Sequence, residues 1–131
     1  TVAKGYNFET CIENIDIGGP SMLRSSAKNH AAVVICSSPA QYPALMEEMK
    51  MHDGCTTIEL RRRFAAEAFA LSAKYDAAIS SWFAKQLNPE QKTDVIVTRP
   101  YLPVRELKYG VNPHQKPAGL YRHLSGRAPS P

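Results

Sequence analysis

The feature that most constrains this chain is a long amphipathic segment that begins after Gly54. Its large apolar residues recur at three- and four-residue steps or their sums, which is typical of one face of a helix. These residues are Leu60, Phe64, Leu71, Tyr75, Ile79 and Phe83. Thr56 and Glu59 form a T-x-x-E capping box at the start, and Pro89 sets the end. The pattern predicts a single helix from about Thr57 to Leu87.

The segments before this helix predict a layered α/β fold. Helices are expected at Phe8–Ile15, at Ser21–Asn29 with Pro20 in its first position, and at Pro39–Met51. The apolar run Ala31–Cys36 predicts a strand buried on both faces, as in a parallel sheet. One strand cannot make a sheet, so its partner strands would come from polypeptide outside this sequence.

The chain changes character after Leu87. Pro89, Pro100 and Pro103 surround a short β-branched run, Val95–Thr98, which indicates a linker or a crossing strand. The last seven residues are expected to fray. We therefore take residues 88–104 as a linker that follows a domain at residues 1–87.

Composition narrows the possible classes of function. The net charge of +4 suits a protein that binds anions, but it does not indicate nucleic acid, and Arg61-Arg62-Arg63 is expected to be a solvated helix face. The three cysteines lack C-x-x-C spacing, which favours a reducing compartment. No apolar run reaches the roughly 20 residues that span a bilayer. We expect a cytosolic protein that contacts neither membrane nor nucleic acid.

Two clusters of residues could carry chemistry. The first is Asp16-Ile17-Gly18-Gly19-Pro20, followed by Lys28-Asn29-His30. A glycine pair before a helix lets the backbone approach a ligand, and the helix start offers free N–H groups. The same pattern also fits a simple interhelical turn, with Lys28 meeting the helix dipole and His30 bonded at the helix end.

The second cluster is the segment from Lys108 to Gln115, with sequence K-Y-G-V-N-P-H-Q. It combines a cation, an aromatic ring and three polar side chains in a loop fixed by glycine and proline, although a plain surface turn fits equally well. His114 has no second His or Cys at ligand spacing, so we expect no metal site.

Three stretches resemble the bifunctional purine-synthesis family, AICAR transformylase/IMP cyclohydrolase. They are N-I-D-I-G-G-P-S-M-L-R-S-S-A-K-N-H-A at residues 14–31, R-R-R-F-A-A-E-A-F-x-x-S-A-x-Y-D-A-A-I-S-x-W-F at 61–83, and L-K-Y-G-V-N-P-H-Q-K-P-A-x-L-Y at 107–121. They occur in the family's order and span most of the chain. The resemblance implies that residues 1–87 belong to the methylglyoxal-synthase-like cyclohydrolase domain and residues 105–131 open the transformylase domain.

The resemblance also implies roles for particular residues. In the cyclohydrolase, which closes formyl-AICAR to IMP without a metal, Asp16, Ile17 and Gly18 would line the base-binding end. Lys28 would face the reacting oxygen, and Asp16 would handle the carboxamide proton. In the transformylase, which uses 10-formyltetrahydrofolate and AICAR, Lys108 and Tyr109 would contact the nucleotide across a homodimer. The family commonly has arginine at the position of Lys108, and lysine cannot make its bidentate contact.

By the same resemblance, the remaining parts of both sites lie outside these 131 residues. The cyclohydrolase phosphate loops would precede the chain and the transformylase catalytic pair would follow it, so we expect the isolated chain to be almost inactive. Two alternatives stay open. One is a non-catalytic regulatory nucleotide-binding module on the same fold. The other is a scaffold that uses the long helix as a dimer seam, although its Phe64, Tyr75 and Trp82 are more simply core residues.

Overall fold

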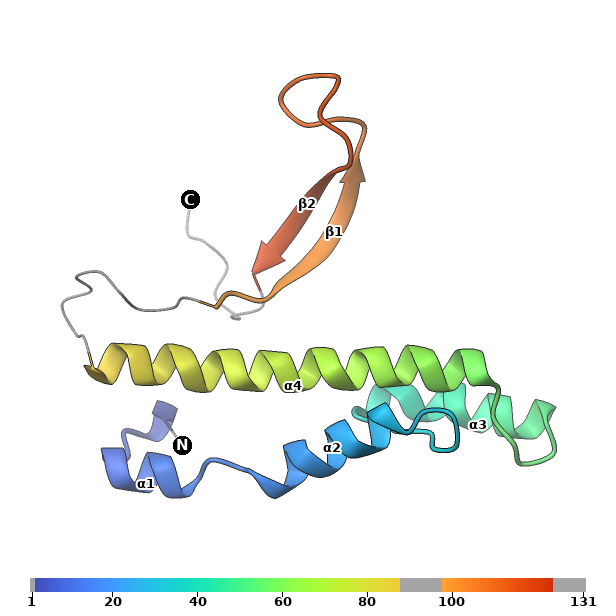
Figure 1. Cartoon of the computed structure of the whole chain (residues 1–131), viewed down its shortest axis with the longest axis horizontal. Coiled ribbons are helices and arrows are strands. Elements are labelled where there is room, and N and C mark those ends of the chain that lie inside the picture. The colour runs from blue at the N-terminus through green and yellow to red at the C-terminus, as the bar shows by residue number, and fades with distance from the viewer. Residues whose placement is uncertain (1, 88–97, 124–131) are drawn as a thin grey trace. The chain divides into compact units, whose positions relative to one another are not determined.

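The computed structural model describes residues 2–87 and 98–123. The chain divides into two compact units, Thr1–Asp76 and Ala77–Pro131, with the division inside the longest helix. The described part of the first unit is helical, and the second unit contains a β-hairpin (Figure 1). The helices are η1 Val2–Lys4, α1 Phe8–Glu13, α2 Gly18–Lys28, η2 Pro39–Gln41, α3 Tyr42–Met51 and α4 Ile58–Leu87. The strands are β1 Tyr101–Leu107 and β2 Ala118–His123.

The long helix is confirmed, with its cap one residue later than expected. The hydroxyl of Thr57, not of Thr56, accepts a hydrogen bond from the Leu60 N–H at 3.3 Å. The Thr57 carbonyl accepts the first helical bond, from the Arg61 N–H at 3.2 Å. Thr57 is held from the other side, because its N–H donates to the Glu48 carboxylate at 3.0 Å. This bond ties the end of α3 to the start of α4.

The buried face of α4 differs from the expected stripe at one position. Leu60 and Phe64 are buried as predicted, but Leu71 is 43% exposed, and the face continues through Ala68 and Ser72. Four residues overshoot one turn of about 3.6 residues, so a row of four-residue steps drifts around the helix. That drift carries the buried face away from Leu71.

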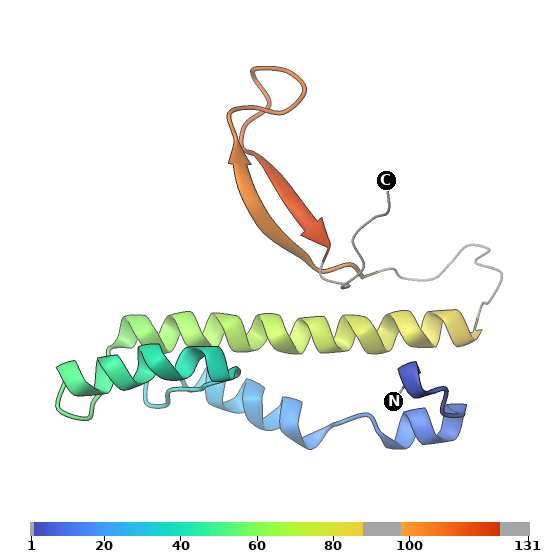
Figure 2. The same cartoon turned by 180° about the vertical axis from the view of Figure 1, so that it is seen from behind.

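Helix α2 packs antiparallel against the first half of α4 (Figures 1 and 2). Ala27 is fully buried with Ala65 and Ala68, and Leu23 and Ile35 pack around them. Small side chains at the contact let the two helix backbones come close. Towards the start of α2, the Arg24 guanidinium donates to the Ser72 hydroxyl at 3.4 Å and lies 5.5 Å from the centre of the Phe69 ring.

The predicted strand Ala31–Cys36 is wrong for the described structure. Residues 29–32 form a turn and residues 33–37 have no regular structure. The N–H groups of Ala32 and Val33 donate to the Asn29 carbonyl at 3.0 and 2.9 Å. A strand needs a neighbour for its backbone groups, and within the described ranges the only strands are β1 and β2, which pair with each other. The described fold is therefore mixed α and β, with one small antiparallel sheet.

The other predicted helices are confirmed with shifted ends. Helix α1 begins at Phe8 as expected, where the Asn7 side chain accepts from the Thr10 N–H at 2.9 Å. Helix α2 begins at Gly18 rather than at Ser21, so the glycine pair lies inside its first turn. The predicted helix Pro39–Met51 forms as η2 followed directly by α3.

The hairpin joins β1 and β2 in antiparallel register, from Tyr101 opposite His123 to Leu107 opposite Ala118. The register is irregular between Pro103 and Arg105, since proline has no N–H for the ladder. Strand β1 begins inside the predicted linker, residues 88–104. Most of that linker lies outside the described residues. Of the run Val95–Thr98, only Thr98 is described. None of the helices in the described ranges is long and apolar enough to cross a bilayer.

Candidate functional site

The Asp16-Ile17-Gly18-Gly19 turn forms the start of helix α2. The Asp16 carboxylate oxygen Oδ1 accepts a hydrogen bond from the Gly19 N–H at 2.9 Å. This bond satisfies one of the N–H groups that a helix leaves free at its first turn, and the helix dipole favours a negative charge there. The other oxygen, Oδ2, accepts no hydrogen bond within residues 2–87 and 98–123, and Ile17 beside it is 72% exposed.

The two glycines of this turn differ in how much space they leave for a side chain. A Cβ at Gly19 would overlap the Asp16 carboxylate, whereas a Cβ at Gly18 would meet nothing within 4 Å. Gly19 is therefore needed for the carboxylate to fold over the helix start. Gly18 is free of that constraint, and its backbone is open to a ligand.

Tyr75 of α4 fixes this turn from the side. Its hydroxyl oxygen accepts a hydrogen bond from the Asp16 N–H at 2.8 Å, across 59 residues of sequence. The sequence pattern identified Tyr75 only as a member of the apolar stripe. A half-buried tyrosine usually gives its hydroxyl a partner, so that general rule was the signal for its second role.

Lys28 is the last residue of α2, at the opposite end of the helix from Asp16. A helix of this length spans about 15 Å. Lys28 is exposed, and Asn29 and His30 follow it in a turn. The structure thus brings Asp16, Ile17 and Gly18 together and places Lys28 one helix length away.

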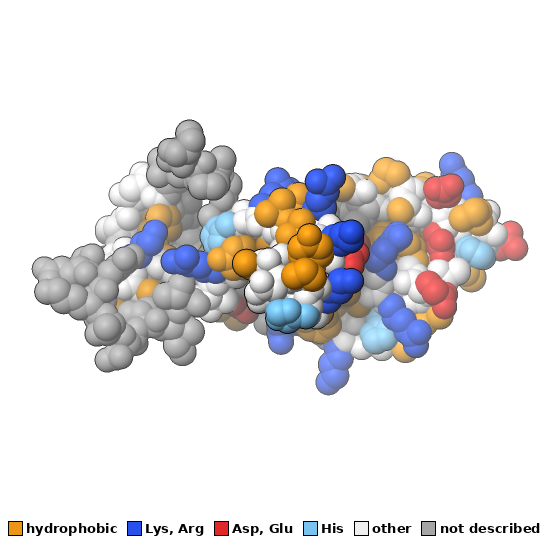
Figure 3. Space-filling view, turned by 90° about the horizontal axis from the view of Figure 1, so that it is seen from above, with side chains coloured by type: hydrophobic (Ala, Val, Ile, Leu, Met, Phe, Trp, Pro, Cys, Tyr) orange, Lys and Arg blue, Asp and Glu red, His pale blue; other side chains and the backbone are white. Residues whose placement is uncertain are grey.

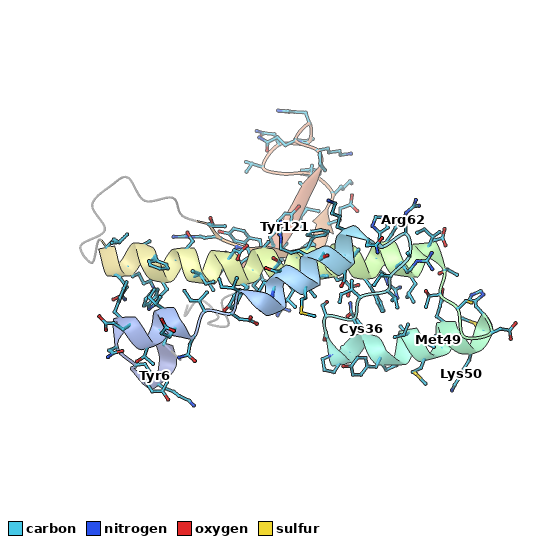
Figure 4. The ribbon with its side chains drawn as sticks, turned by 60° about the horizontal axis from the view of Figure 1, so that its bottom comes forward. Tyr6, Cys36, Met49, Lys50, Arg62 and Tyr121 are labelled. Carbon is cyan, nitrogen blue, oxygen red and sulfur yellow. The ribbon has the colours of Figure 1, made fainter. Side chains whose placement is uncertain are left out.

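Arg61 holds the turn that follows Lys28. Its Nε donates to the His30 carbonyl at 2.9 Å and its Nη2 to the Ala31 carbonyl at 3.2 Å. Its Nη1 donates to the Thr56 carbonyl and hydroxyl. The expectation that the arginine cluster is only a solvated face is therefore wrong for Arg61, because a planar guanidinium can bind several carbonyls at once. Arg62, labelled in Figure 4, is exposed as expected.

His30 and the cysteines take up no ligand-binding arrangement here. The His30 ring nitrogen Nδ1 lies 3.2 Å from the Ala27 carbonyl, which agrees with a side chain satisfied at a helix end. Cys36, labelled in Figure 4, is partly buried, and desolvation raises the pKa of its thiol. Within residues 2–87 and 98–123, no three His, Cys, Asp or Glu side chains gather as a metal site would require.

The second cluster of predicted residues lies in the loop between β1 and β2. Gln115 organises this loop: its side-chain oxygen accepts from the Asn112 N–H at 3.0 Å, and its carbonyl accepts from the Gly110 N–H at 2.9 Å. A Cβ at Gly110 would lie 2.8 Å from that side-chain oxygen, so glycine leaves room for it. These contacts give Gln115 a structural role in the loop.

Lys108 and Tyr109 begin this loop. Tyr109 is 41% exposed. Lys108 lines an open hollow of about 610 Å³ together with Glu106, Leu107, Lys116, Pro117 and Ala118. Figure 3 looks onto the hairpin, where blue cationic side chains surround orange apolar ones. Two lysines at a hollow suit a ligand that carries negative charge.

Comparison with known proteins gives a consistent result. Residues 26–130 match the family model described as AICARFT/IMPCHase bienzyme. Lys28, Lys108 and Tyr109 lie inside this match, and Asp16 lies before it. The bifunctional purine biosynthesis protein PurH of Rhodospirillum rubrum is 47% identical over 123 residues, which is 94% of this chain and 23% of that protein.

Two further relatives have the same name. PurH of Agrobacterium fabrum is 48% identical over 91% of this chain and 22% of its own length. PurH of Bradyrhizobium diazoefficiens is 49% identical over 90% of this chain and 22% of its own length. The chain thus spans between a fifth and a quarter of the length of these relatives.

The described residues thus include a helix start capped by Asp16 and a hairpin loop with two lysines beside a hollow, and the chain is similar to bifunctional biosynthetic proteins. More specifically, the chain belongs to the AICARFT/IMPCHase bienzyme family.

Proposed function

We propose that this chain forms one wall of an IMP cyclohydrolase site and the opening of an AICAR transformylase domain in purine biosynthesis. The observation that carries the proposal is the Asp16 turn, in which one carboxylate oxygen is held at the helix start and the other is available to a ligand. Family membership supplies the reaction.

The cyclohydrolase reaction joins two neighbouring groups of formyl-AICAR. The carboxamide nitrogen attacks the formyl carbon, a C–N bond forms, and the formyl oxygen leaves as water to give IMP. Asp16 Oδ2 accepts the carboxamide proton and Lys28 donates a proton to the oxygen that becomes negative. The backbone of Ile17 and Gly18 orients the base, and orientation alone can contribute several kcal/mol.

Because α2 separates the two side chains, Lys28 must extend along the helix for both to meet one substrate. This requirement makes the two roles separately testable. We expect Lys28→Ala to abolish cyclisation without preventing nucleotide binding, and Asp16→Asn to lower the rate of the same step. Normal turnover in Lys28→Ala would rule out its role.

In the second domain, Lys108 and Tyr109 contact the nucleotide of the transformylase, which transfers a formyl group from 10-formyltetrahydrofolate to AICAR. The hollow beside Lys108 supports this assignment. We further propose that the parent protein is a cytosolic homodimer whose cyclohydrolase domain has a methylglyoxal-synthase-like parallel sheet.

The proposal is best tested in a chimera of Rhodospirillum rubrum PurH in which the matched segment is replaced by this chain. We expect the chimera to convert formyl-AICAR to IMP and the isolated chain to form almost none. Appreciable IMP from the isolated chain would contradict the view that its sites are incomplete.

The alternative is a non-catalytic nucleotide-binding module. It predicts that formyl-AICAR binds the chimera but is not converted, and that Asp16→Asn and Lys28→Ala change only affinity. The presence of both Asp16 and Lys28 favours the enzyme, because a binder does not need a proton acceptor and a proton donor together.

A further inference from the structure

Helix α4 contacts both ends of helix α2 through side chains whose roles the sequence did not reveal. At one end, the Tyr75 hydroxyl accepts from the Asp16 N–H at 2.8 Å. At the other end, Arg61 donates to the carbonyls of His30 and Ala31 at 2.9 and 3.2 Å. These contacts join elements far apart in sequence, and all the residues involved belong to one compact unit.

The contacts follow a single antiparallel register. Moving along α2 from Asp16 through Arg24 and Ala27 to His30, the partner on α4 changes from Tyr75 to Ser72, then Ala68 and Ala65, and finally Arg61. Figures 1 and 2 show the two helices side by side along this stretch. Alanine contacts in the middle keep the helices close but do not set their sliding position, whereas the polar contacts at the ends are directional.

We propose that Tyr75 and Arg61 are positioning residues, which fix Asp16 and Lys28 relative to one another by anchoring the two ends of α2 to α4. The inference rests on the proposed function of Asp16 and Lys28 and adds two residues to it. Neither Tyr75 nor Arg61 needs to touch the substrate, because each binds backbone within three residues of the group that does.

The physical reason is preorganisation. A hydrogen bond to the Asp16 N–H restricts the residue whose carboxylate must also fold back over Gly19. The Asp16 carboxylate is then held in one orientation, so that its oxygen Oδ2 points in one direction. Arg61 restricts the turn after Lys28 in the same way, by binding two successive carbonyls with one rigid group. Misplacement of a reacting group by about 1 Å can cost a large factor in rate.

The first test measures hydrogen exchange in the 131-residue chain by NMR. Tyr75→Phe keeps the ring but removes the acceptor, so we expect the Asp16 amide to exchange at least about fivefold faster, as the loss of one hydrogen bond would allow. The matched control is Tyr42→Phe on α3, where the tyrosine is 55% exposed. Equal exchange of the Asp16 amide in both variants would overturn the proposal.

The second test measures the rate of IMP formation in the chimera. We expect Tyr75→Phe to lower kcat about tenfold, the equivalent of one hydrogen bond, with little change in KM. Asp16→Asn should make the effect of Tyr75→Phe disappear, because a residue that acts through Asp16 has nothing left to position. If Tyr75→Phe lowers kcat equally in both backgrounds, Tyr75 does not act through Asp16 and the inference is wrong.

Arg61 is tested in the same chimera. Arg61→Gln should lower kcat, and Arg61→Lys should restore little of it, since lysine cannot bind two carbonyls with one planar group. The control is Arg62→Gln at the exposed neighbouring position. A full rescue by Arg61→Lys would mean that charge alone matters and would refute positioning. If Asp16→Asn and Lys28→Ala themselves leave IMP formation normal, the proposed function fails instead, while the exchange test still decides whether Tyr75 anchors the turn.

Discussion

Asp16 and Gln115 both fold a polar side chain over a glycine, yet the two turns are held in different ways. In the helical unit, the Asp16 turn is bound to α4 by a contact that crosses 59 residues. In the hairpin, the hydrogen bonds of Gln115 to Gly110 and Asn112 join residues no more than five apart. The same local device therefore depends on tertiary packing in one place and on neighbouring residues in the other. We therefore predict that a substitution in the helical core disturbs the Asp16 turn but not the Gln115 loop.

The largest expected effect comes from Phe64→Ala. Phe64 of α4 is 1% exposed, and truncating such a phenylalanine costs about 3–5 kcal/mol. We expect the helical unit to unfold at much lower urea, measured by far-ultraviolet circular dichroism. Leu71→Ala, at a 43% exposed position on the same helix, should cost far less. NMR signals of the Gln115 loop should be unchanged. A large shift in them would contradict the view that this loop is held only by neighbouring residues.

The second prediction separates the two glycines of the Asp16 turn. Gly19→Ala forces a Cβ into the Asp16 carboxylate and should destabilise by about 1 kcal/mol through loss of the cap. Gly18→Ala enters open space at a helical position and should stabilise by about 0.5 kcal/mol. Urea unfolding of the two variants measures the difference. Identical midpoints would mean that the Asp16 bond contributes nothing to α2.

The third prediction concerns the hairpin loop. Gln115→Ala removes the acceptor for the Asn112 N–H and should cost about 1 kcal/mol locally. The loop amides should then exchange faster with solvent, while the Asp16 amide keeps its rate. Asn112→Ala is the matched control, because it keeps the backbone N–H that Gln115 binds. A loop that stays protected in Gln115→Ala would show that its order comes from elsewhere.

The smallest effect is a pH dependence at the junction of α3 and α4. Bonds from the Thr57 hydroxyl and N–H lower the pKa of Glu48 below its ordinary value. A carboxyl with a lowered pKa stabilises the fold above its unfolded pKa, and this contribution is lost as the pH falls through the folded pKa. NMR titration should show the lowered value and its partial return towards normal in Thr57→Val. An unchanged titration in that variant would assign the shift to another group.

Sequence patterns predicted much of this fold because its signals are local. The periodicity of α4, and the proline in the first turn of α2, act over one or two helical turns. The prediction of a strand at Ala31–Cys36 is wrong, since an unbroken apolar run fits a strand only where partner strands exist. The prediction that Leu71 lies on the buried face of α4 is wrong as well, because the position of that face depends on where α2 crosses α4.

The candidate site likewise has some features that the local sequence predicts and others that the packing of helices sets. By itself, the sequence determined the Asp16 turn, the cationic loop and the family, since each depends on residue types at fixed short spacing. Only the tertiary structure decided that Tyr75 binds the Asp16 backbone and that Arg61 binds the turn after Lys28. Periodicity shows that a residue faces the core but not which distant backbone group it meets, because that pairing is set by the packing of two helices.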